Sequence, residues 1–249
     1  MSADLQRRYS GAMRADLYLV EHGHFPSRAQ AQAAIKAGRV SVDGQPLRKA
    51  SAPIRDGARI EAGREHPYVG RGGLKLAHAL DTFGVIASGR VCLDVGSSTG
   101  GFTDVLLRAG AARVYAVDVG RDQLDAGLRK DPRVVSMEGQ DARELHAAMF
   151  DPAPDLLVCD ASFISVTKLL APALALTREA VILFKPQFEV GRANIGKGGI
   201  VRAGQAEALD RVRRWVSEQG WRVADETESP IKGGSGNAES LLHLVRRSA

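Results

Sequence analysis

Charged side chains stand at the ends of several short apolar runs in this chain. Asp94, Asp118, Asp160 and Lys185 each close such a run, and Asp141 follows another. A carboxylate only accepts hydrogen bonds, which suits the hydroxyl and amino groups of a ligand, whereas a lysine can orient or accept a proton. A single aspartate after a strand is often just a helix cap. Charged residues after five successive runs indicate a ligand site at one edge of a sheet.

The elements that would carry these residues alternate between strand and helix patterns. Apolar runs predict strands over 91–95, 113–118, 134–137, 156–159 and 181–184. Helical spacing predicts helices over 102–109, 122–128, from after 141 to 150, and over 166–176. A helix over about 205–218 and two strands over 221–228 and 239–245 follow. This alternation predicts an α/β protein with a parallel, doubly wound sheet that binds its ligand at the carboxyl ends of the strands.

A glycine-rich turn follows the first of these strands. The pattern Asp-x-Gly-x-x-x-Gly resembles motif I of the S-adenosylmethionine (SAM)-dependent methyltransferases, although a plain βα turn would also use glycine. The resemblance implies a Rossmann-like sheet of seven strands, the last antiparallel. It implies that Asp118 accepts the ribose hydroxyls of SAM and Asp141 its adenine amino group. The remaining SAM-binding residues that it implies are Asp94, Gly96, Ser97, Ser98, Thr99, Gly100, Gly101 and Phe102.

The residues after the fourth strand bear on the methyl acceptor. Cys159-Asp160-Ala161-Ser162-Phe163 lacks the Pro-Pro of amino-methyltransferases, and Cys159 lacks the preceding proline of the cytosine-carbon class. Lys75, Asp160, Lys185 and Glu239 instead occur in the order of the tetrad in FtsJ-type ribose 2′-O-methyltransferases. That resemblance implies that the lysines hold and steer a ribose hydroxyl and that the acids orient the lysines. Two structural ion pairs are the alternative.

The N-terminal quarter carries most of the positive charge. Residues 1–65 hold 11 Lys and Arg against 7 Asp and Glu, whereas the rest of the chain holds 23 against 22. Residues 14–61 resemble an S-four-type RNA-binding domain, a small α+β domain, after an N-terminus over 1–13 that is expected to be disordered and before a linker over 62–67. The expected phosphate-binding residues are Arg14, Arg28, Lys36, Arg39 and Lys49. Arg71, which opposes the dipole at the start of a predicted helix, joins them as an RNA-binding candidate. A small helical cap with surface arginines is the alternative.

The motifs taken together resemble the TlyA family, often labelled haemolysin A, over about residues 14–246. The residues that carry this likeness are 69–76, 94–104, 159–163 and 185–189. The resemblance implies 2′-O-methylation of a cytidine in ribosomal RNA, with SAM as cofactor and a ribosomal subunit as partner. Members of the family modify the large subunit alone or both subunits. The short segment after the last expected strand favours the large subunit.

Composition limits the remaining classes. The chain has no apolar run of membrane-spanning length and no apolar N-terminal signal, so a cytoplasmic protein without a membrane partner is expected. Cys92 and Cys159 offer neither a disulfide framework nor a metal set, and no metal is expected. The alternatives are a 2′-O-methyltransferase for another RNA, a non-catalytic RNA-binding protein, a pseudouridine synthase and, more distantly, a pore-forming haemolysin.

Overall fold

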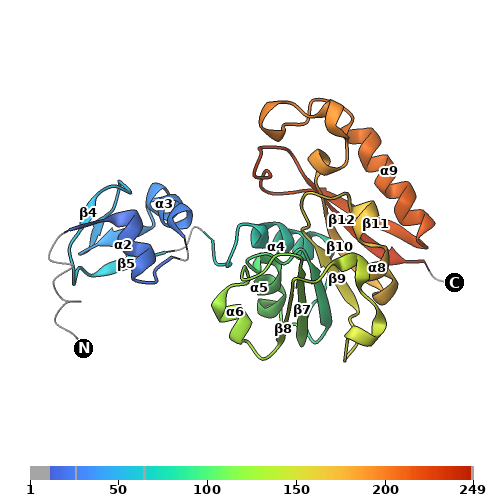
Figure 1. The fold of residues 1–249 in the computed structure, drawn as a ribbon, viewed down its shortest axis with the longest axis horizontal. Coiled ribbons are helices and arrows are strands. Elements are labelled where there is room, and N and C mark those ends of the chain that lie inside the picture. The colour runs from blue at the N-terminus through green and yellow to red at the C-terminus, as the bar shows by residue number, and fades with distance from the viewer. Residues whose placement is uncertain (1–11, 26, 64–65, 248–249) are drawn as a thin grey trace. The chain divides into compact units, whose positions relative to one another are not determined.

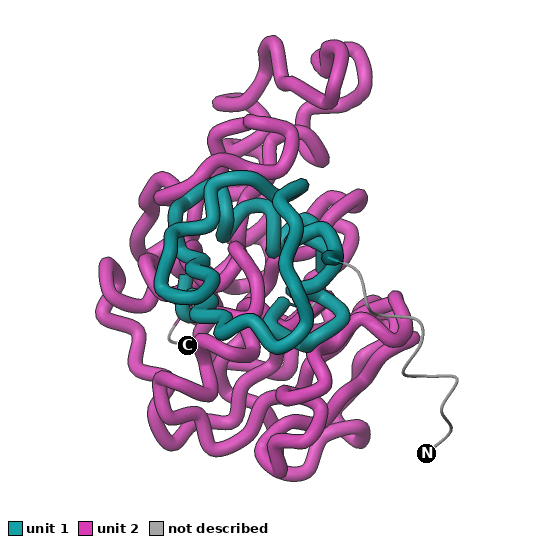
Figure 2. The backbone as a smooth tube through the Cα atoms, turned by 90° about the vertical axis from the view of Figure 1, so that its left-hand side faces the viewer, with its two compact units in different colours: residues 1–67 teal, residues 68–249 magenta. Residues whose placement is uncertain are grey.

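The computed structural model describes residues 12–25, 27–63 and 66–247. The chain divides into two units, residues 1–67 and residues 68–249, which Figure 2 shows in separate colours. The prediction that residues 1–13 are disordered falls almost entirely outside the described ranges. Met13 is described, and it pairs with Ile54 in a short strand.

The first unit places two helices over small sheets. Its elements are β1 (Met13–Arg14), α2 (Ala15–Glu21), α3 (Arg28–Lys36), β2 (Val40–Val42), β3 (Gln45–Pro46), β4 (Pro53–Ile54) and β5 (Ile60–Ala62). Ser27 caps α3, because its hydroxyl accepts a hydrogen bond from the Gln30 amide at 3.3 Å. Leu19, Ile35 and Ile54 lie in one buried cluster, so the helices pack on the strands through a common apolar core.

The second unit is built on one mixed sheet. Its strands are β6 (Val91–Val95), β7 (Arg113–Asp118), β8 (Val134–Glu138), β9 (Leu156–Cys159), β10 (Glu179–Phe184), β11 (Trp221–Glu228) and β12 (Ser240–Arg246). They lie in the order β11-β12-β10-β9-β6-β7-β8, and their number, seven, is the one expected from the resemblance to SAM-dependent methyltransferases. β12 runs antiparallel to both of its neighbours, β10 and β11, while β6 to β10 pair in parallel.

Helices cover both faces of this sheet (Figure 1). The helices are α4 (Gly72–Phe83), α5 (Gly101–Arg108), α6 (Ala126–Lys130), α7 (Val166–Leu169), α8 (Ala171–Leu176) and α9 (Gln205–Glu218). Leu76, Leu106 and Val158 share one buried cluster, whereas Leu170, Val212 and Leu157 share another. Neighbouring residues of β9 thus enter opposite clusters, which is why its sequence is apolar without interruption.

Several predicted helices are shorter than expected. The helix predicted over 122–128 begins only at Ala126, because Asp122 has a φ of 55° and the Asp125 carboxylate caps the amides of Gly127 and Leu128. The stretch from 141 to 150 contains two 3-10 turns, η1 (Ala142–Glu144) and η2 (Ala147–Met149), instead of a helix. The helix predicted over 166–176 is divided into α7 and α8, since Pro172 begins a new helix and cannot continue the preceding one.

Candidate functional site

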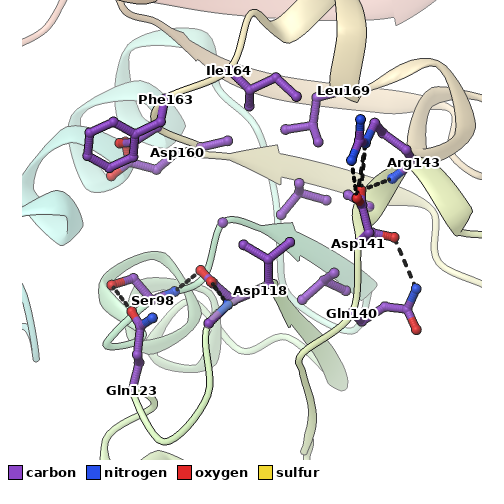
Figure 3. A pocket seen from close by; sticks show the side chains of 18 residues that line it. Ser98, Asp118, Gln123, Gln140, Asp141, Arg143, Asp160, Phe163, Ile164 and Leu169 are labelled. Carbon is purple, nitrogen blue, oxygen red and sulfur yellow. Dashed lines mark hydrogen bonds and ion pairs between the residues drawn. The ribbon is translucent and has the colours of Figure 1, made fainter.

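A cavity of about 520 Å³ lies at the carboxyl ends of β6, β7 and β9 (Figure 3). Predicted site residues from four separate segments of the chain line it, namely Gly96, Ser98, Asp118, Asp141 and Asp160. Other residues of its wall have no role predicted from the sequence, and they include Gln123, Gln140, Arg143, Ser162 and Phe163.

A second cavity of about 210 Å³ shares Gly96, Ser98, Asp160 and Ser162 with the first. Its remaining lining comes from the glycine turn, from the start of α4 and from the end of β10, and includes Arg71, Ser97, Thr99, Gly101, Phe102 and Lys185. The two cavities are therefore neighbours with one common wall. A ligand that occupied both would present one end to Lys185 and the other to Asp141.

The glycine turn permits close backbone approach at two positions. Gly96 has a φ of 81°, and a Cβ there would lie 2.8 Å from the Cα of Ala161. Gly100 has a φ of 95°, and a Cβ there would clash with the side chain of Leu128. Any larger residue would be strained and would push the turn away from the loop after β9. The turn and that loop together form the common wall of the cavities.

Buried polar atoms beneath the turn lack protein partners. Asp94 is fully buried, and its Oδ2 accepts a hydrogen bond from the Thr103 hydroxyl at 2.6 Å. Its Oδ1 has no partner among the described residues, and neither does the buried hydroxyl of Ser97. Burial raises the pKa of Asp94 to about 7, and the neighbouring charges of Asp160 and Asp118 act in the same direction. A polar or cationic ligand group would satisfy these atoms.

Asp118 and Asp141 differ in their surroundings. The carboxylate of Asp118 accepts hydrogen bonds from the amides of Ser98 at 2.9 Å and Gly120 at 2.7 Å, which fixes its orientation at the cavity wall. The carboxylate of Asp141 instead forms an ion pair with Arg143 at 2.5 Å, and this guanidinium holds the pKa of Asp141 below its usual range. Figure 3 shows both acids at the cavity.

The four tetrad residues form two ion pairs, of which Lys75–Glu239 is buried and Lys185–Asp160 is partly buried. The Nζ of Lys75 lies 2.5 Å from Oε2 of Glu239, and the Nζ of Lys185 lies 2.7 Å from Oδ1 of Asp160. Lys185 also donates hydrogen bonds to the Asp160 carbonyl at 3.0 Å and to the Ser162 hydroxyl at 2.7 Å.

The first turn of α4 brings the two pairs to the same region. A Cβ on Gly72 would lie 3.0 Å from Oδ2 of Asp160, and Lys75 follows on the next turn of the same helix. Lys75 and Lys185 are 7% and 8% exposed. Lys185 lines the smaller cavity, whereas Lys75 and Glu239 line neither of the two cavities.

Phe163 is the most conspicuous residue that sequence reasoning left without a role. It is 91% exposed and has a φ of 69°, a conformation that costs energy for an aromatic residue. Its ring lies 5.3 Å from the ring of Phe188, measured between centroids, at the mouth of the larger cavity. The sequence offered only a weak signal, its place three residues after Asp160.

The predicted RNA-binding arginines of the first unit converge on a buried acid. Arg14 and Arg28 form ion pairs with Asp16 at 3.1 Å and 2.9 Å, and these contacts hold the pKa of Asp16 well below its usual range. Gln32 also donates to Asp16, and Lys36 follows one turn later on the same face of α3. Lys36, Arg39 and Lys49 are exposed, whereas Arg71 belongs to the second unit.

The described part of the chain has neither a cluster of metal ligands nor a helix that could span a membrane. It contains no group of three or more His, Cys, Asp or Glu residues arranged to hold a metal ion. None of its helices has the length and apolar character needed to cross a membrane. Cys92 and Cys159 are buried among core residues, and burial raises the pKa of each thiol to about 12.

Comparison with known proteins agrees with this geometry. The FtsJ-like methyltransferase family matches residues 68–246, and the S4 domain matches residues 13–60. The chain is 42% identical over 240 residues to hemolysin A of Brachyspira hyodysenteriae, which covers 94% of this chain and 100% of that protein. It is 44% identical over 239 residues to the 16S/23S rRNA (cytidine-2′-O)-methyltransferase TlyA of Mycobacterium tuberculosis, covering 93% and 89% of the two chains. A solved hemolysin-like protein of Streptococcus thermophilus has a TM-score of 0.75 and 39% identity, covering 96% and 90%.

Proposed function

This chain belongs to the FtsJ-like methyltransferase family, and from that premise we propose that it transfers the methyl group of SAM to the 2′-oxygen of a cytidine in ribosomal RNA. One observation carries the proposal. Asp160 lines both cavities and forms an ion pair with Lys185, so a tetrad residue lies at the wall that the two cavities share, where a cofactor that occupied both would meet the acceptor hydroxyl.

The residues of the two cavities fit SAM. The fixed carboxylate of Asp118 is an acceptor for ribose hydroxyls, and Gln140 and Asp141 lie where the adenine would reach. The unpartnered Asp94 Oδ1 and Ser97 hydroxyl suit the charged amino-acid end of the cofactor. Bound SAM supplies an activated methyl group on a sulfonium.

In the proposed adenine site, Asp141 is already ion-paired with Arg143. Its carboxylate retains acceptor capacity, because each oxygen can accept more than one hydrogen bond. Arg143 is exposed and lines the same cavity, so its guanidinium can pack beside the adenine plane. Sequence reasoning assigned the adenine contact to Asp141 alone, and the proposal now assigns it to the Asp141–Arg143 pair.

In this proposal Lys185 orients the 2′-hydroxyl of the acceptor ribose and accepts its proton. Its ammonium is held from three sides, by the Asp160 carboxylate, the Asp160 carbonyl and the Ser162 hydroxyl. A ribose hydroxyl that displaced the Ser162 contact would lie directly beside Nζ. Methyl transfer requires the hydroxyl to lose its proton, and Lys185 would accept that proton only as the neutral amine, after its ammonium has released a proton to solvent. Much of the remaining rate comes from alignment of oxygen, methyl and sulfur.

Phe163 suits the base of the target nucleotide. An exposed aromatic ring beside a catalytic cavity can stack on a base that has left its helix, and such stacking contributes about 1–3 kcal/mol per base. This role would also explain the strained backbone at Phe163, because the positive φ turns the ring toward the cavity mouth and away from the core.

Ribosomal RNA as substrate rests on the first unit together with the curated relative. The S4 domain match, the pair of arginines Arg14 and Arg28 at Asp16, and the exposed Lys36 support a phosphate-binding role for this unit. The Mycobacterium tuberculosis relative carries 16S/23S cytidine-2′-O activity in its name. We therefore propose cytidines of either subunit as candidate targets, with the large subunit first.

The test is to map 2′-O-methyl groups on ribosomal RNA from cells with and without this protein, and after treatment of unmodified subunits with the purified protein and SAM. We expect a new reverse-transcription stop at a cytidine, which must appear only when SAM is present. Methylation on a base, or no methylation of either subunit, would contradict the proposal. An alanine at Gly96 provides the negative control, because it should exclude the cofactor.

The basic first unit leads to a second expectation. Removal of residues 1–67 should weaken ribosomal RNA binding by about tenfold or more near 100 mM salt, and should make binding less sensitive to salt. SAM binding should stay unchanged, because both cavities are lined by residues of the second unit. Fluorescence anisotropy over a salt series and calorimetry with SAM measure the two quantities. If the protein without residues 1–67 bound RNA with the same affinity and the same salt dependence as the full chain, the first unit would have no role in RNA binding.

A further inference from the structure

A third cavity, of about 500 Å³, lies outside the proposed SAM and acceptor sites. It is formed by α7, the 3-10 turn η3 (Pro186–Phe188) and one face of α9, the long helix labelled in Figure 1. Arg211, Arg214, Trp215 and Glu218 follow the i, i+3, i+4, i+7 spacing on α9, so their side chains share one side of the helix. None of these residues takes part in the function proposed above.

The cations of this cavity are available to an anion. Lys168 and Arg214 are exposed, and neither forms an ion pair with any residue in the described ranges. Arg211 donates a hydrogen bond to the Glu189 carbonyl at 2.9 Å, which holds its guanidinium against the wall. The three cations line one cavity and repel one another, and a bound anion would reduce this repulsion.

The carboxylates of the cavity do not cancel these cations. Glu189 is used to hold the start of α7, because its oxygens accept hydrogen bonds from the Val166 amide at 2.9 Å and the Ser165 hydroxyl at 2.7 Å. Burial raises the pKa of Glu189, and the neighbouring charge of Arg211 acts in the opposite direction. Glu218 is exposed at the far end of the helix face, one turn beyond Arg214.

Aromatic rings connect this cavity to the proposed active site. Phe188 and Trp215 line it, and the Phe188 ring contacts the ring of Phe163, which lines the SAM cavity. An RNA strand whose target nucleotide lies at Phe163 would place its next nucleotides beside Phe188 and Trp215. Cations interleaved with aromatic rings are the pattern with which proteins bind single-stranded RNA.

We propose that the cavity between α7, η3 and α9 is a subsite for a nucleotide that flanks the methylated one, with its phosphate at Lys168, Arg211 and Arg214 and its base against Trp215. The proposal rests on the function proposed above, since it places the RNA strand relative to Phe163. It makes the enzyme read a short single-stranded segment around the target, in addition to any contact made by the first unit.

The test compares two double variants of the full chain. Lys168→Gln/Arg214→Gln removes the two unpaired cations of the cavity. Arg178→Gln/Arg222→Gln removes equal charge from exposed positions at the starts of β10 and β11, which lie at the opposite end of the strands from the active site. Methyl transfer to protein-free ribosomal RNA, SAM calorimetry and anisotropy over a salt series are measured for each.

We expect the cavity variant to raise KM for RNA about tenfold, with kcat and SAM affinity within twofold of wild type. The slope of log affinity against log salt should fall by about 1.5, since each lost phosphate contact removes about 0.7–0.9. The control variant should change KM for RNA by less than about twofold. It should change the slope of log affinity against log salt by less than about 0.5. Equal behaviour of the two variants would overturn the proposal. Weaker binding to intact subunits with unchanged binding to protein-free RNA would also overturn it, because the cavity would then take a protein.

Tryptophan fluorescence gives a readout that does not need methyl transfer. The chain has two tryptophans, and Trp221 is 1% exposed, so quenching by RNA would report on Trp215. We expect ribosomal RNA to quench the emission of wild type and to quench Trp215→Phe much less. Absence of quenching would contradict the subsite even in a protein that methylates RNA. Quenching in a protein that methylates no RNA would refute the proposed function and retain the subsite.

Discussion

Replacement of Lys185 with Ala should lower the rate of methyl transfer by about two to four orders of magnitude, the range that a positioned proton-transfer group contributes. Lys185 lies 2.7 Å from Asp160 at the junction of the two cavities, so its loss leaves the acceptor hydroxyl without a partner. SAM affinity should remain within about threefold, because Asp118, Asp141 and the glycine turn are untouched. Single-turnover methylation and calorimetry measure the two quantities.

Lys185→Arg refines this experiment. Arginine keeps the positive charge and can pair with Asp160, but it does not release a proton in proteins. A variant as inactive as Lys185→Ala would show that the lysine handles the proton, whereas recovered activity would show that it acts as an oriented cation. Lys130→Ala, at an exposed lysine near the end of α6, is the matched control. Wild-type turnover by Lys185→Ala would eliminate the tetrad from the mechanism.

The Lys75–Glu239 pair should affect stability and activity in separable ways. Glu239→Ala leaves a buried lysine without its partner, and we expect the free energy of unfolding to fall by about 3–5 kcal/mol. The double variant Lys75→Met/Glu239→Leu replaces both charges with apolar side chains of similar size. It should recover most of that stability, because two well-packed apolar residues can substitute for a buried ion pair.

The double variant should nevertheless remain inactive. We expect its rate of methyl transfer to be at least about 100-fold below that of wild type. Urea unfolding measures the stability, and a methylation assay at saturating SAM measures the rate. Glu226→Ala, which removes a surface partner of Arg213, is the control and should cost about 1 kcal/mol or less. A stable double variant with wild-type activity would identify the pair as purely structural.

The strands were predictable because each is a local feature. Leu156–Cys159 begins and ends where its apolar run does, and in Arg113–Asp118 the four residues between the charged ends are buried and apolar, because a strand covered on both faces buries its interior residues. The helices between 122 and 176 were less predictable, because side chains that compete for backbone amides, such as Asp125, end or delay a helix that its spacing permits. Pro172 divided another helix at a position where helical spacing alone gives no warning.

The sequence by itself determined the fold class, the glycine turn and the identity of the charged residues, because each depends on neighbours along the chain. Only the tertiary structure decided which charges meet. Lys75 and Glu239 are 164 residues apart and touch because α4 packs beside β12, which begins one residue after Glu239. The ion pair of Asp141 with Arg143, the exposed ring of Phe163 and the cavity on α9 also depend on packing. Long-range contacts of this kind are set by how the buried faces of the elements fit together, and local residue patterns do not contain that information.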